Sequence, residues 1–139
     1  MRVKQVEVRA LCHATEDPEK IKAALSFLTG SEKIYEEDLE GFYGEPIILM
    51  KVKENGKPAE LLFKKITSDV ENKKRLLQDL DLRIEGWKLH LRLDKQQLVM
   101  GKISVASGDN TVKLVVVAGG RAEKGGSKEF FAGLLGDGS

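Results

Sequence analysis

The chain has 139 residues, of which 41% are hydrophobic and 32% are charged, and these values are typical of one soluble globular domain. Its formal net charge is only +1, so bulk charge does not by itself indicate nucleic-acid binding. The single cysteine, Cys12, excludes an intramolecular disulfide and a multi-cysteine zinc site. No signal-peptide pattern and no apolar run near the ~20 residues of a membrane span are visible, so we expect a cytoplasmic protein without membrane contact.

Charge and glycine are distributed unevenly along the chain. Residues 1–46 carry a formal charge of −4, residues 47–118 carry +5, and residues 119–139 are neutral. Seven of the fourteen glycines fall in residues 119–139, where ordering the backbone is entropically costly. We therefore expect a single α+β domain over residues 1–118 and a flexible, glycine-rich tail over residues 119–139. Alternatively, the pairs Phe130/Leu134 and Phe131/Leu135 could form a short apolar anchor for a partner.

The first third of the chain predicts a strand, a helix and a second strand. Alternating apolar residues predict the opening strand over residues 6–12. Asp17 and Pro18 have the pattern of an N-cap and a first helical position, and the apolar spacing that follows predicts a helix ending at Gly30. Residues 33–40 predict a weaker, acidic strand.

The middle of the chain predicts one more strand and two helices before the period changes. Residues 47–53 predict a strand, and Pro58 starts the next helix. The capping-box spacing over residues 68–71 predicts that a helix restarts there. From Leu80 onward the apolar period is two, with a turn or bulge expected at Gly86. The start of this stretch could equally be the frayed end of the preceding helix.

The remaining elements complete the expected architecture. Asp94 predicts the cap of a short helix that ends at Gly101. Residues 103–106 and 111–118 predict a hairpin around Ser107–Asn110. Helices that alternate with hairpins predict an α+β fold, namely a two-layer sandwich with a mixed, mostly antiparallel sheet and helices packed on one face.

One predicted strand carries a candidate phosphate-binding face. If residues 88–94 form a strand, its leucines face the core, and Lys88, His90 and Arg92 line the other face. At ~3.3–3.4 Å per residue they lie about 6.6–6.8 Å apart, close to the phosphate spacing of a nucleic-acid strand. Arginine can bind a phosphate through two hydrogen bonds, and lysine adds a point charge. The alternative is an ordinary solvated strand face.

Two further basic features lie in the same half of the chain. Lys95 directly follows the strand and continues its basic face, so we assign it to the same surface. Lys73, Lys74 and Arg75 make one side of a predicted helix strongly positive. They predict a second phosphate-binding patch, or alternatively a solvated helix face.

Two aromatic residues lie between glycines in a predicted loop. Phe42 and Tyr43 are flanked by Gly41 and Gly44, which allow the backbone to turn while the rings project. Exposed rings can stack on unpaired bases. Alternatively, at least one of the rings covers the edge of the core.

Patterns typical of enzymes are absent from the sequence. It contains no GxGxxG, P-loop, HExxH or GxSxG motif. We expect no catalytic residue, no cofactor and no metal site, and a general base at His13 or His90 is kept only as the remaining enzymatic alternative.

Three segments together carry a resemblance to a known family. They are the opening strand with residues 13–17, the loop of residues 41–47, and Leu91–Gln96 with the closing Gly101. Their order and separation over about residues 3–118 resemble a family of small archaeal proteins described as predicted RNA-binding proteins or exosome subunits. The resemblance implies a fold similar to that of the ribosomal protein that binds 5S rRNA, an RNA-linked role and a cytoplasmic setting.

Two functional hypotheses follow. The first is a non-catalytic RNA-binding protein, an accessory factor of RNA processing, the exosome or ribosome-related complexes. Its site is predicted to comprise Lys88, His90, Arg92, Lys95, Lys73, Lys74, Arg75, Phe42 and Tyr43. The second is a protein-interaction subunit whose basic face binds an acidic protein partner or another copy of itself as a homodimer.

Overall fold

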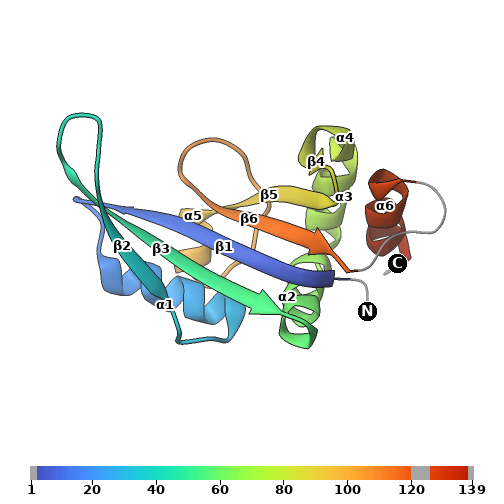
Figure 1. The fold of residues 1–139 in the computed structure, drawn as a ribbon, viewed down its shortest axis with the longest axis horizontal. Helices are drawn as coiled ribbons and strands as arrows, with labels where there is room; N and C mark the ends of the chain where they lie inside the picture. Colours follow the sequence, from blue (N-terminus) through green and yellow to red (C-terminus); the bar gives the residue numbers. More distant parts are fainter. Residues whose placement is uncertain (1–2, 120–125, 138–139) are drawn as a thin grey trace.

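A computed structural model describes residues 3–119 and 126–137, which form one sheet and a layer of helices (Figure 1). The strands are β1 (Val3–His13), β2 (Tyr35–Glu40), β3 (Pro46–Asn55), β4 (Ile84–Glu85), β5 (Lys88–Asp94) and β6 (Thr111–Ala118). The helices are α1 (Pro18–Thr29), α2 (Lys57–Thr67), α3 (Val70–Gln78), α4 (Leu80–Arg83), α5 (Lys95–Val99) and α6 (Ser127–Asp137).

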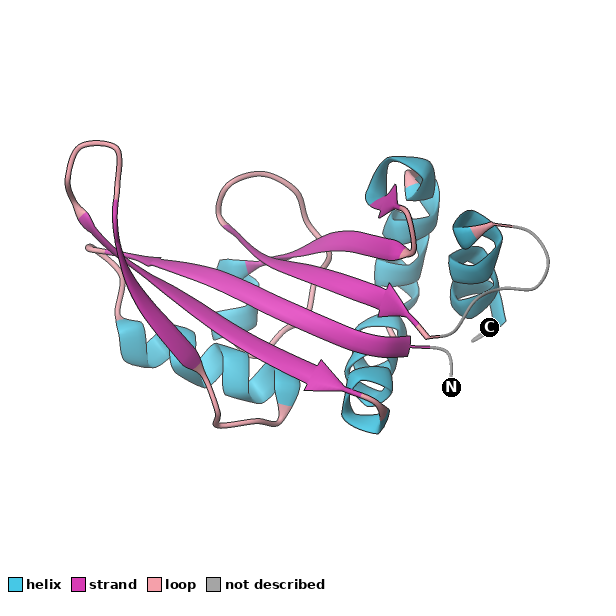
Figure 2. Ribbon diagram, in the orientation of Figure 1, coloured by secondary structure: helices cyan, strands magenta, loops and turns pink. Residues whose placement is uncertain are grey.

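The sheet has the strand order β2-β3-β1-β6-β5-β4, and all of these neighbouring pairs are antiparallel. Helices α1, α2 and α5 lie behind it in Figure 2, so one face of the sheet is covered and the other is open. The expected α+β class with helices on one face is confirmed, and the described strand pairs include no parallel one.

Strand alternation places the core between the two layers. In β1, Val6, Val8 and Ala10 are buried, and the residues between them point to the open face. In β5, the leucines at positions 89, 91 and 93 are buried in the same core. Because every second residue of a strand points to the same side, the polar residues of β5 must lie on the open face.

The predicted helix boundaries follow from local chemistry. The carboxylate of Asp17 accepts a hydrogen bond from the Glu19 N–H (3.0 Å), and Pro18 occupies the first helical position. Gly30, with a φ of 75°, ends α1 in the left-handed region that favours glycine. Asp69 caps α3 by accepting from the Asn72 N–H (3.0 Å).

The predicted hairpin of residues 103–106 with 111–118 is wrong. Val105 instead forms an isolated bridge with Leu93, on the edge of β5 away from β6. The buried side chain of Asn72 holds this segment, since its amide donates to the Ile103 carbonyl (3.0 Å) and its oxygen accepts from the Val105 N–H (2.9 Å). Contacts between distant segments thus decide the partner of residues 103–106.

The expected flexible tail is wrong for residues 127–137, which form α6. Phe131 and Leu135 are buried in the core, and Phe130 packs edge-to-face on Trp87 with 6.2 Å between ring centroids. A Lys128–Asp81 ion pair joins α6 to α4. Residues 120–125 and 138–139, which were part of the same expected tail, lie outside the described residues. That residues 1–118 make a separate domain stays a prediction.

Candidate nucleic-acid interface

The open face of the sheet presents a row of four cations across four neighbouring strands. In the antiparallel register, Arg92 of β5 lies opposite Lys113 of β6, Lys113 lies opposite Arg9 of β1, and Arg9 lies opposite Lys51 of β3. We call these four residues the cationic row. At the usual spacing of about 4.8 Å between strands, the row spans about 14 Å. Tyr35 of β2 lies opposite Lys51 and ends it.

The cationic row is electrostatically unfavourable for the protein alone. Like charges directly opposite each other in a sheet destabilise it by a few tenths of a kcal/mol to about 1 kcal/mol per pair. Among the described residues, Glu7 is the carboxylate that pairs with the row, through Arg9 Nε at 3.1 Å. The Lys51 ammonium lies 5.5 Å from the centroid of the Tyr35 ring. A surface that gathers like charges in this way favours an anionic ligand.

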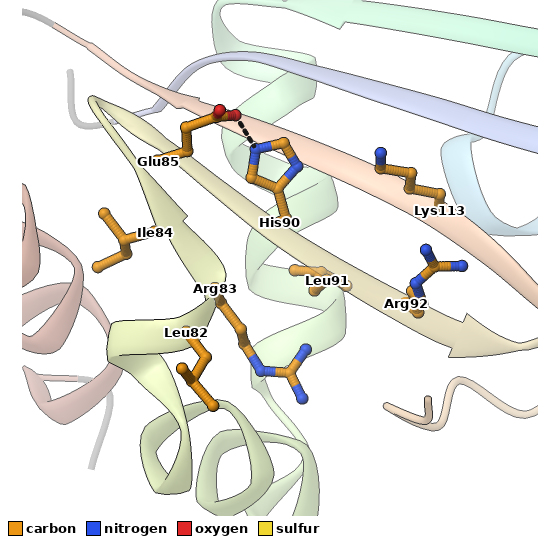
Figure 3. A pocket seen from close by; sticks show the side chains of 8 residues that line it. All are labelled: Leu82, Arg83, Ile84, Glu85, His90, Leu91, Arg92 and Lys113. Carbon is orange, nitrogen blue, oxygen red and sulfur yellow. Dashed lines mark hydrogen bonds and ion pairs between the residues drawn. The ribbon is translucent and has the colours of Figure 1, made fainter. Parts of the chain in front are cut away.

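A shallow cavity borders each end of the row. At the β5 end, a cavity of about 500 Å³ is lined by Leu82, Arg83, Ile84, Glu85, His90, Leu91, Arg92 and Lys113 (Figure 3). Figure 3 shows the Arg92 and Lys113 side chains beside each other on adjacent strands. At the other end, a cavity of about 370 Å³ is lined by Glu7, Lys33, Tyr35, Lys51 and Lys53. Further basic side chains line both cavities, namely Arg83, which pairs with Asp79 at 2.6 Å, at the β5 end and Lys33 and Lys53 at the other.

The three residues predicted along β5 share the open face, but they are not equally available. Lys88 and Arg92 are exposed, whereas His90 is half-buried and its Nε2 lies 3.2 Å from the Glu85 carboxylate. The Arg92 guanidinium donates to Thr111 Oγ1 (3.2 Å) and contacts no carboxylate among the described residues. Of the three, Arg92 is the one that belongs to the cationic row.

Sequence reasoning missed three members of the cationic row, namely Arg9, Lys51 and Lys113. Arg9, Lys51 and Lys113 lie on three different strands, so no cluster of basic residues in the sequence indicates that they meet. They come together only through the register of three strand pairs that are far apart in sequence. The alternation of apolar and polar residues in each strand does predict that the three side chains point to the open face.

Lys95 does not lie on this surface, and its assignment to it is wrong. The side chain is 2% exposed, and Nζ donates to the Leu11 carbonyl (2.6 Å) and to the Glu16 carboxylate (3.0 Å). Partial burial alone would raise the pKa of Glu16, but hydrogen bonds from the His13 N–H and from Lys95 outweigh it and lower the pKa. Lys95 therefore ties α5 to the turn between β1 and α1.

The basic residues of α3 are not brought together with the β5 residues. Helix α3 packs in the helical layer, with Leu76 in the core on the covered side of the sheet. Lys73 is half-buried and Lys74 is exposed, and the Arg75 guanidinium donates to the Val105 carbonyl at 2.6 Å. This patch is separate from the cationic row.

Phe42 and Tyr43 lie at the tip of the β2–β3 hairpin, and neither ring covers the core. They are 92% and 89% exposed, and their rings contact each other edge-to-face with centroids 5.0 Å apart. Gly44, with a φ of 80°, provides the backbone conformation of the turn. The Tyr43 N–H donates to the Glu45 carboxylate at 3.0 Å, which fixes the turn while the rings project.

The candidate general bases lie at different places on the sheet. His13 ends β1 opposite Ile47, whereas His90 lies on β5 beside Glu85. Cys12 is buried, and desolvation together with the nearby Glu16 carboxylate raises the pKa of its thiol. Among the described residues there is no cluster of His, Cys, Asp and Glu that could hold a metal ion. The helices of the described part are too short or too polar to cross a membrane.

The fold and this surface define a class of small α+β protein with one helix-covered sheet face and one cationic face. Residues 5–118 match the model of a protein family described as RNA binding, and the chain belongs to this family. It is 35% identical over 121 residues to an uncharacterized protein of Methanocaldococcus jannaschii, covering 79% of this chain and 80% of the relative. It is 27% identical over 124 residues to a protein of Pyrococcus abyssi that is named an RNA-binding protein, covering 81% and 79%.

The fold itself occurs in a solved structure. A DUF54 protein from Methanothermobacter thermautotrophicus superposes with a TM-score of 0.83 at 20% identity, covering 99% of this chain and 98% of that one. At this identity the similarity concerns the fold alone.

Proposed function

We propose that this protein binds RNA without catalysing a reaction, and that it holds phosphates on the cationic row of its open sheet face. The observation that carries the proposal is the register that sets Arg92, Lys113, Arg9 and Lys51 opposite one another on four strands. Phosphates bound there relieve the repulsion between these side chains and release counterions from the RNA. Membership of an RNA-binding family supports RNA as the anionic polymer.

The test compares two double variants that each remove two positive charges. Lys51→Gln/Lys113→Gln changes the cationic row, and Lys20→Gln/Lys64→Gln changes exposed lysines of α1 and α2 on the helical side. Fluorescence anisotropy with a structured RNA at ~100 mM salt is expected to show affinity reduced at least tenfold for the first variant and nearly unchanged for the second. Equal effects would place binding elsewhere, including on the α3 patch.

The same variant of the cationic row tests whether these lysines bind a ligand or support the fold. Because the row is repulsive, Lys51→Gln/Lys113→Gln is expected to leave the free energy of unfolding unchanged or to raise it by up to about 1 kcal/mol. Urea unfolding checks this. A large loss of stability would show that these lysines support the fold, and any reduction in RNA binding would then follow from unfolding.

The cellular setting that we propose is cytoplasmic, as an accessory factor of RNA processing, the exosome or a ribosome-related complex. The family match and the resemblance in sequence support it. Affinity purification with and without RNase treatment tests it, because an accessory factor held through RNA loses its partners after digestion. Partners that survive digestion but are lost in Lys51→Gln/Lys113→Gln would favour the alternative, an acidic protein bound to the same face.

A further inference from the structure

The open sheet face has two chemically different halves. Beyond the cationic row, toward the β2–β3 turn, Leu11 of β1 lies opposite Leu49 of β3, and Ile47 of β3 lies opposite Leu39 of β2. We call these four residues the apolar strip. Leu11 and Leu39 are 40% and 37% exposed, and Leu49 and Ile47 are half-buried.

The apolar strip leads to the aromatic tip formed by Phe42 and Tyr43. Ile47 and Leu39 lie at the end of the β2–β3 hairpin, and Phe42 and Tyr43 lie in the turn that joins the two strands. Figure 1 shows this turn projecting at one end of the sheet. From Lys51 to Ile47 is four residues of β3, or about 13 Å. The open face thus carries cations and then aliphatic side chains, and it ends at a turn with two exposed rings.

The cationic half binds phosphates but offers little for bases to stack on. Its four cations, two lysines and two arginines, carry no aromatic ring, and the ring of Tyr35 at the end of the row already contacts the Lys51 ammonium, 5.5 Å from its centroid. Proteins that bind single strands combine cations with rings on which successive bases stack. A cationic surface without such rings suits RNA whose bases are already paired and stacked, which is recognised through its backbone and shape.

The other half has the opposite chemistry. Two rings that are about nine-tenths exposed, next to aliphatic side chains, suit the faces of unpaired bases. Most carboxylates of β2 do not oppose RNA here, because Glu36, Asp38 and Glu40 point to the helical side, where Glu36 pairs with Lys22 at 3.0 Å. Glu37 is the β2 carboxylate that shares the face with the apolar strip.

We propose that the preferred ligand is a junction between double-stranded and single-stranded RNA. The duplex lies on the cationic row, and the unpaired extension follows the apolar strip to the aromatic tip. This inference rests on the proposed function, since it names the class of RNA that the same face takes. Each half of the face then matches the part of the ligand that it contacts in charge and polarity.

The test uses four RNA probes and the full chain. The probes are a blunt duplex of about 16 base pairs, the same duplex with an unpaired extension of about four nucleotides, made separately at the 5′ and the 3′ end, and the single strand alone. The unmodified protein is expected to bind one extended duplex at least about fivefold more tightly than the blunt one, which is the lower end of what one stacked base contributes.

Two variants assign the preference to the tip. Phe42→Ala/Tyr43→Ala is expected to abolish the preference for the extended duplex and to leave affinity for the blunt duplex unchanged, since both rings are outside the core. The row variant Lys51→Gln/Lys113→Gln is expected to weaken binding of both duplexes by the same factor. Leu61→Ala/Met100→Ala removes exposed apolar side chains from the helical side and serves as the matched control.

The outcomes separate the two proposals. If blunt and extended duplexes bind equally, if the single strand alone binds as tightly as the junction, or if the tip variant keeps the preference, the junction proposal is overturned while RNA binding stands. If none of the probes binds, the proposed function fails as well. Circular dichroism and urea unfolding of each variant show that the proteins compared are folded.

Discussion

Lys95 and Lys113 have the same side chain in opposite environments. Lys113 lies among like charges on the open face, whereas Lys95 is buried and hydrogen-bonded to Leu11 and Glu16. In the sequence, both are basic residues within or directly after the end of an alternating strand pattern. Only the path of the chain after Asp94 decides that Lys95 turns inward, and this is why sequence reasoning could find the basic character of the region but not each lysine's role.

At Lys95 we predict a loss of stability without a direct effect on RNA binding. Lys95→Met removes the ammonium that donates to the Leu11 carbonyl and pairs with the Glu16 carboxylate, which then keeps only the His13 N–H, and the free energy of unfolding is expected to fall by about 2–3 kcal/mol at pH 7. Urea unfolding measures this. Under conditions where the variant is folded, the salt dependence of its RNA affinity is expected to equal that of the unmodified protein. A changed salt dependence would instead show that Lys95 contributes to the RNA interface.

The lowered pKa of Glu16 predicts a pH dependence of the same contact. A carboxylate whose pKa is lower in the folded than in the unfolded protein contributes stability above its ordinary pKa, and this contribution is lost as the pH falls through the folded value. The difference in stability between the unmodified protein and Glu16→Gln is therefore expected to be greatest near pH 7 and to shrink below about pH 4. Unfolding at several pH values tests this, and a difference that grows on acidification would contradict it.

At the scale of elements, local patterns predicted most strands and helices, because caps and apolar periods act within a few residues. The cap at Asp17, the end at Gly30 and the alternation in β1 and β5 are all present. The pairing of the segment around Val105 was predicted wrongly and helix α6 was not predicted, because both depend on partners distant in sequence. Asn72 holds the first, and burial of Phe131 stabilises the second despite its glycines.

At the scale of elements, we predict how much the packing of helix α6 contributes to the stability of the protein. Phe131 is fully buried, so Phe131→Ala is expected to lower the free energy of unfolding by about 3–5 kcal/mol. Lys128→Ala, which removes an exposed ion pair with Asp81, is expected to change it by less than about 1 kcal/mol. Thermal or urea unfolding distinguishes the two. If Phe131→Ala were as stable as the unmodified protein, burial of α6 would be contradicted and the flexible tail predicted from composition would be supported.

At the scale of the whole molecule, the net charge of +1 conceals an uneven distribution. Residues 1–46 are acidic overall, yet Arg9 belongs to the cationic row, because strand pairing and not sequence position decides which charges meet. Most β2 carboxylates point to the helical side, away from that row. The sequence therefore predicted basic residues along one strand and one helix, whereas the fold brings cations together across four strands.

The most direct test of the account is the salt dependence of RNA affinity. Each phosphate contact contributes nearly one unit to the slope of log K against log salt concentration. Between ~50 and 200 mM salt, Lys51→Gln/Lys113→Gln is expected to reduce that slope by about two units relative to the unmodified protein, and Lys20→Gln/Lys64→Gln is expected to leave it unchanged. An unchanged slope in the first variant would contradict the claim that the cationic row holds RNA phosphates.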